Sequence, residues 1–79
     1  MSSQQEKQRQ CQLAAAALAG ITMRFDATCK LYDSAVFLRQ GQEADKFRME
    51  LHELLDQRLD HTGRLMQLTR EMIELPPGD

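Results

Sequence analysis

The chain has 79 residues, a length that allows one small domain whose own core is only marginally sufficient for stability. Hydrophobic residues make up 42% and charged residues 28% of it, a balance typical of a folded, soluble chain and not of a disordered one. The formal net charge of −2 argues against a general nucleic-acid binder and against a membrane-surface binder.

Residues 4–39 predict one long helix. From Cys11 onward, core-type residues recur at alternating steps of three and four, which places them on a single helical face. They are Cys11, Ala14, Leu18, Ile21, Phe25, Thr28, Tyr32 and Ala35. The two cysteines are five turns apart and cannot bond within one chain, which favours reduced thiols. In an antiparallel dimer, however, Cys11 of one chain could approach Cys29 of the other.

Residues 40–42 predict the turn. Gly41 suits the left-handed backbone conformation that often ends a helix, and the preceding Arg39 complements the negative end of the helix dipole. A short connection between two long helices predicts an antiparallel hairpin. Two weaker breaks, at Asp33-Ser34 and at Thr62-Gly63, leave open a compact three-helix bundle.

Residues 43–75 predict a second long helix, which ends where Pro76-Pro77 cannot continue it. Its apolar residues form two stripes rotated by about 100° from each other. The first stripe is Ala44, Phe47, Leu51, Leu54, Leu65, Leu68, Met72 and Leu75, and the second is Leu55, Leu59, Met66 and Ile73. A helix with two apolar stripes needs more than one neighbour, and so short a chain supplies only one.

We therefore expect a single all-α domain over residues 1–79, an antiparallel two-helix hairpin that dimerises into a four-helix bundle and ends in a tail at 76–79. The predicted dimer or bundle core is Leu18, Ile21, Phe25, Tyr32, Phe47, Leu51, Leu54 and Leu55. Arg58 and His61 continue the first stripe as a polar layer, which in a helical bundle costs stability but can fix register and partner number.

The residues give little support to an enzyme, a metal site or a cofactor. His52 and His61 lie two and a half turns apart, on opposite sides of one helix, so they cannot bind one ion within a single chain. There is no glycine-rich phosphate loop and no catalytic motif of the common hydrolase or metalloprotease types. We expect no enzymatic activity, no cofactor and no metal.

The predicted function is protein binding. The chain would be a small cytoplasmic regulator, chaperone, anti-activator or inhibitor, of bacterial or phage type, that binds itself and another protein. The expected partner-binding residues are Leu65, Met66, Met72 and Ile73, since flexible methionines suit a groove that accepts apolar side chains. The alternative is an RNA-binding helical hairpin that uses the basic side of the first helix, namely Lys7, Arg9, Arg24, Lys30 and Arg39. Neither a signal peptide nor a membrane span is expected from the sequence, because its longest apolar run is too short.

Overall fold

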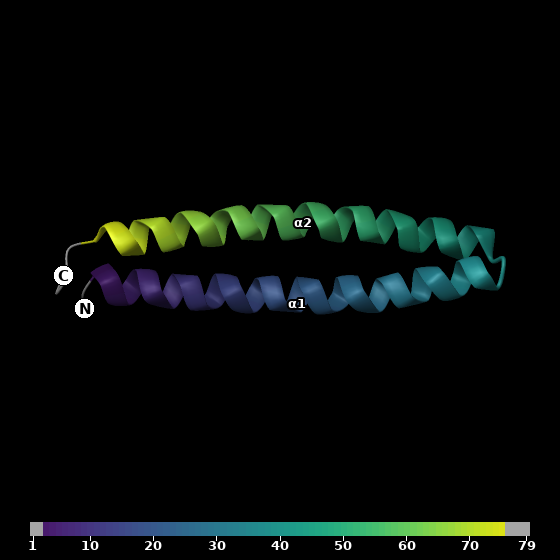
Figure 1. The fold of residues 1–79 in the computed structure, drawn as a ribbon, viewed down its shortest axis with the longest axis horizontal. Coiled ribbons are helices and arrows are strands. Elements are labelled where there is room, and N and C mark those ends of the chain that lie inside the picture. Colours follow the sequence, from purple (N-terminus) through teal and green to yellow (C-terminus); the bar gives the residue numbers. More distant parts are fainter. Residues whose placement is uncertain (1–2, 76–79) are drawn as a thin grey trace.

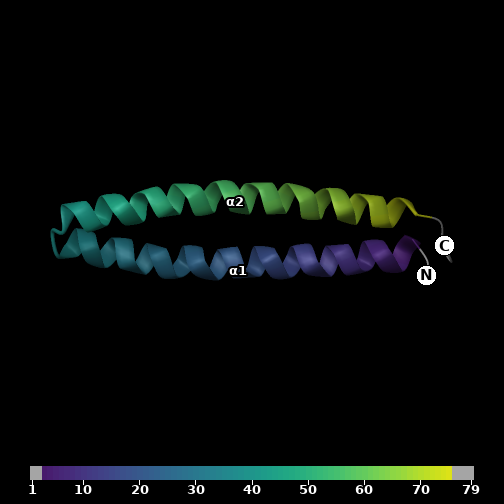
Figure 2. The same cartoon turned by 180° about the vertical axis from the view of Figure 1, so that it is seen from behind.

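Two helices, α1 (Ser3–Phe37) and α2 (Gly41–Glu74), make up the computed structural model, which describes residues 3–75. They lie side by side in opposite directions along their whole length, so that Ser3 and Leu75 are at one end and the turn is at the other (Figure 1 and, from behind, Figure 2). The molecule is a rod of 59 × 14 × 13 Å. The predicted all-helical hairpin is confirmed. Within the described residues neither Asp33-Ser34 nor Thr62-Gly63 interrupts a helix, so the three-helix alternative is wrong. The expected tail at 76–79 lies outside the described residues.

The helices meet along one continuous seam, whose members are all buried or half-buried. The steps of three and four that the sequence shows keep these residues on the facing sides of both helices. In α1 the seam residues are Lys7, Cys11, Ala14, Leu18, Ile21, Phe25, Thr28, Tyr32 and Ala35. In α2 they are Ala44, Phe47, Leu51, Leu54, His61, Leu65, Leu68, Met72 and Leu75.

The turn differs from the sequence prediction. Arg39, and not Gly41, has the left-handed backbone conformation, with φ of 57°, while Gly41 begins α2. The N–H of Gln40 donates to the carbonyl of Ala35 (2.8 Å), and the N–H of Arg39 donates to the carbonyl of Val36 (3.1 Å). These two bonds form the Schellman arrangement that satisfies the last carbonyls of a helix. The prediction of a left-handed Gly41 is therefore wrong, because the hydrogen-bond register places this conformation two residues earlier.

The hairpin has a thin core. Among the described residues only Ile21, Thr28, Ala35, Leu54 and Leu68 are buried, and none of the large side chains is below 2% exposure. Meanwhile eleven large hydrophobic side chains remain exposed. Two helices can cover each other on one face only, so the second stripe of α2 has no intramolecular partner.

Candidate interaction surface

The flanks of the seam decide what the hairpin presents to a partner. Each step along a right-handed helix turns the side chain by about 100°, and α1 and α2 run in opposite directions. Residues that directly follow a seam residue therefore turn to the same side of the hairpin on both helices. Residues that directly precede a seam residue turn to the opposite side. We call these the apolar side and the acidic side, after the residues that they carry.

The acidic side is rich in carboxylates, most of them on α2. Ten residues of α2 directly precede a seam position, counting Arg58 as the seam position that follows Gln57. Six of these ten are acidic and two are basic, which leaves a strong excess of negative charge. They are Glu43, Lys46, Glu50, Glu53, Gln57, Asp60, Arg64, Gln67, Glu71 and Glu74.

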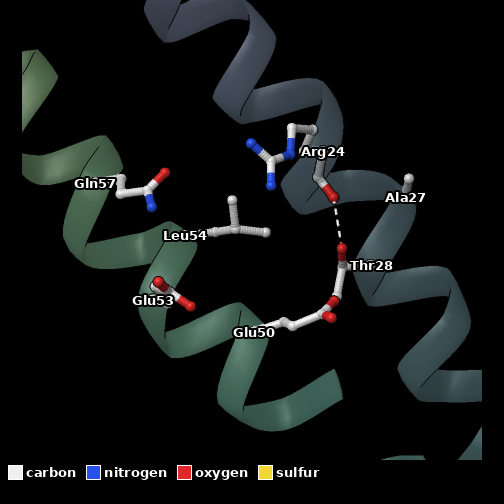
Figure 3. A pocket seen from close by; sticks show the side chains of 7 residues that line it. All are labelled: Arg24, Ala27, Thr28, Glu50, Glu53, Leu54 and Gln57. Atoms are coloured by element: carbon white, nitrogen blue, oxygen red, sulfur yellow. Dashed lines mark hydrogen bonds between the residues drawn. The ribbon is translucent and has the colours of Figure 1, made fainter. Parts of the chain in front are cut away.

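An open cleft of about 330 Å³ lies on the acidic side, roughly midway along the rod. Figure 3 shows Leu54 projecting from α2 into the gap between the helices, with Arg24 and Thr28 on α1 beyond it. The hydroxyl of Thr28 donates to the carbonyl of Arg24 at 2.8 Å, so its hydrogen-bonding capacity is satisfied by its own helix. The remaining lining residues, from both helices, are Ala27, Glu50, Glu53 and Gln57. The cleft is lined by residues that directly precede a seam position on both helices. Such residues therefore do lie on one side of the hairpin, as the helix geometry requires.

The apolar side carries the second stripe of α2. Leu55, Leu59, Met66 and Ile73 are 41, 63, 66 and 74% exposed. Thr62 and Thr69 lie between them and are half-buried. The hydroxyl of Thr69 donates to the carbonyl of Leu65 at 2.8 Å, so this residue can offer its methyl group to a neighbour. The result is a continuous apolar strip of about 27 Å, given the helical rise of 1.5 Å per residue.

Helix α1 supplies small side chains to the same side. Ala15 and Ala19 are exposed, and Thr22 is half-buried. Each of them directly follows a seam residue, so they flank the part of the α2 strip nearest the middle of the rod, while Gln8 and Gln12 flank the rest. This contribution of α1 was not predicted from the sequence, although these positions are offset by one from the predicted core positions of α1.

The four predicted partner-binding residues divide into two pairs. Met66 and Ile73 are exposed on the apolar side, whereas Leu65 and Met72 are half-buried in the seam. A shallow depression on α2 is lined by Leu65, Met66, Thr69, Arg70, Ile73 and Glu74. In the hairpin, a partner can therefore reach Met66 and Ile73 directly, and Leu65 and Met72 only at their edges.

The predicted core residues lie in the seam with one exception. Ile21 and Leu54 are buried, while Leu18, Phe25, Tyr32, Phe47 and Leu51 are half-buried. Leu55 is 41% exposed and belongs to the apolar side, so it packs in a core only if a further helix covers it.

Both residues of the predicted polar layer occupy seam positions, but only the His61 side chain is covered. It is half-buried, and its Nδ1 lies 2.9 Å from the carbonyl oxygen of Gln57. Arg58 is exposed, and the half-buried polar neighbour of His61 is Gln57. In the isolated hairpin the Arg58 side chain is exposed, since a long arginine can start from a seam position and keep its guanidinium in water. Whether a dimer recruits it into a polar layer stays a prediction.

The basic residues of α1 do not gather on one face. Lys7 is in the seam, where its Nζ pairs with Glu71 Oε2 at 3.0 Å. Arg24 lies on the acidic side, Arg9 and Lys30 face away from α2, and Arg39 is in the turn. The positive charges therefore give no continuous track for a nucleic-acid backbone.

Residues 3–75 form neither a metal-ligating cluster nor a membrane-spanning helix. Cys11 and Cys29 are free and half-buried. No group of three or more His, Cys, Asp or Glu side chains in this part of the chain could hold a metal ion. Neither described helix combines the length and the apolar character needed to cross a membrane.

Comparison with known protein families, with curated proteins and with solved structures finds no match to this chain. The apolar side is therefore the feature of the described residues that best indicates a function.

Proposed function

We propose that this chain is a protein-binding module that engages helices of another polypeptide through its apolar side. The observation that carries the proposal is the uncharged strip of Leu55, Leu59, Met66 and Ile73, left open on a hairpin with a thin core. An amphipathic helix laid along such a strip buries apolar surface on both partners, at roughly 25 cal/mol per Å². The role is one of binding and regulation, and not of catalysis.

The proposed mechanism is helix packing that completes a bundle of four helices, either by docking in the groove between α1 and α2 or by exchange of a helix. Met66 and Ile73 are the primary anchors because they are already exposed. Leu65 and Met72 join them once the partner approaches the edge of the seam. The regulator would act as a chaperone, an anti-activator or an inhibitor by covering an apolar helix of its target.

Site-specific photo-crosslinking in the cells that make the protein tests this proposal. A photoreactive phenylalanine analogue is placed at Met66, and in a second variant at Met49, which is 70% exposed and faces away from α1. We expect a crosslinked polypeptide from position 66 and little or none from position 49. Adding Ile73→Asp to the first variant should reduce its crosslinked yield at least several-fold. Equal yields at both positions, or no product at position 66, would contradict the proposal.

A further inference from the structure

We infer that the occupant of the apolar side is a second copy of this chain, held with the two turns at the same end of the dimer. The inference rests on the proposed function, since it names the partner of the same surface. Three features carry it: the distribution of charge over the two sides, the pairing of large with small side chains, and the thin core.

Charge selects the side on which a second copy can pack. Packing through the acidic sides would either oppose the carboxylates of the two α2 helices or bury them against the largely uncharged flank of the partner's α1, and both are unfavourable. On the apolar side, the residues that directly follow a seam position carry no charge in two stretches, 8–22 of α1 and 55–73 of α2. These stretches lie opposite each other in the half of the rod that contains the chain ends. Self-association through this half brings no like charges together.

Side-chain size then selects the orientation. The Lys7–Glu71 pair fixes the register of the antiparallel helices, in which the two residue numbers add up to about 78. Ala19 of α1 is therefore level with Leu59 of α2, and Thr22 is level with Leu55. A twofold axis parallel to the rod places each α2 over the partner's α1 at the same level. Leu55 and Leu59 then meet Thr22 and Ala19, so that large side chains face small ones as packing at native density requires, while Met66 lies level with Gln12.

The opposite orientation lacks this complementarity. An axis perpendicular to the rod would place α2 over the partner's α2 and α1 over the partner's α1. Large side chains would then crowd one half of the interface, and alanines would leave the other half poorly filled. The fit of large α2 side chains against small side chains of the partner's α1 therefore favours the dimer in which both turns lie at one end.

The contact does not extend to the turn. There the apolar side carries Asp26, Asp33 and Asp45 against a single cation, Arg48, which pairs with Asp45 at 3.3 Å. In the inferred orientation these carboxylates of the two copies would lie near one another, so the hairpins are expected to diverge beyond Leu55. An interface of about five helical turns is short, and we expect a dimer that dissociates reversibly on dilution.

The first measurement is the solution mass of the full chain by light scattering across a wide concentration series. We expect a shift from 9.1 kDa towards twice that mass as concentration rises. Leu59→Asp should abolish the shift by placing a charge in the apolar strip, whereas Met49→Asp, on the outer face of the same helix, should leave it unchanged. A wild-type chain of 9.1 kDa at every concentration would overturn the inference.

Orientation is tested by pulsed electron spin resonance on the dimer. A nitroxide is attached at Gln42→Cys, next to the turn, in a chain that also carries Cys11→Ala and Cys29→Ser and whose mass matches that of the wild type. We expect a distance between copies below about 40 Å, since contacting helices lie 8–10 Å apart. A distance near or above the 59 Å length of the rod would overturn the inferred orientation.

The outcomes separate this inference from the proposed function. A monomeric chain that still forms a crosslink from position 66 to a different polypeptide would refute the second copy and leave the binding role intact. Absence of any crosslink from position 66, in a chain that is also monomeric, would refute both.

Discussion

Adjacent leucines on α2 have different environments. Leu54 is 5% exposed and projects into the seam, whereas Leu55, turned by about 100°, is 41% exposed on the apolar side. The stability of the hairpin thus depends on a few side chains, each of which contributes a large share of a small core. Substitutions at neighbouring positions should therefore differ widely in their effects.

The first prediction concerns Leu54→Ala. The substitution removes most of a buried side chain, and we expect it to lower the free energy of unfolding by about 2–4 kcal/mol. The matched control is Met49→Ala, on the same helix but 70% exposed, for which we expect a change below about 0.5 kcal/mol. Urea denaturation followed by circular dichroism measures both. Similar effects of the two substitutions would mean that Leu54 is not in the core.

The second prediction concerns Arg39, which holds a φ of 57° at the end of α1. A side chain at this backbone conformation costs roughly 1 kcal/mol, and glycine lacks that cost. We expect Arg39→Gly to raise the free energy of unfolding by up to about 1 kcal/mol. Arg39→Ala is the control, because it removes the same charge and keeps a Cβ; it should give no such gain. An equal gain from both variants would assign the effect to charge instead.

At the scale of the helices, periodicity predicted the fold well. The expected ranges 4–39 and 43–75 are close to the observed Ser3–Phe37 and Gly41–Glu74. Steps of three and four identified the seam because burial between two helices depends on the angular position of each residue, which the sequence determines. Leu18, Ile21 and Leu54 are examples.

Features that depend on local hydrogen bonds or on side-chain flexibility were less predictable. Gly41 was the obvious candidate for a left-handed turn, but the bond from Gln40 to Ala35 places that conformation at Arg39. Arg58 fits the periodicity of the seam, but it is exposed. The role of α1 in the apolar side was missed because alanines such as Ala15 and Ala19 give only a weak hydrophobic signal, and their position beside the α2 strip depends on how the two helices pair.

At the scale of the whole molecule, the core of the hairpin is a single layer of side chains, the seam between α1 and α2. A third prediction is that folding and association are coupled, because a second copy would supply the burial that the hairpin lacks. We expect the thermal midpoint of the wild-type chain to rise with protein concentration. Leu59→Asp should lower the midpoint and remove its dependence on concentration, whereas Met49→Asp should retain that dependence. A concentration-independent midpoint of the wild type would contradict the coupling.

The placement of both helix ends at one end of the rod also determines how the hairpin responds to mechanical force. A force that separates Ser3 from Leu75 peels the helices apart and does not shear them along their length. The load falls on one helical turn at a time, beginning at the Lys7–Glu71 pair and reaching the Arg39 turn last. At any moment a single pair of facing helical turns resists this force. The helices should therefore separate under a weak force that pulls their open ends apart. A much stronger force should be needed to slide one helix past the other along the axis of the rod.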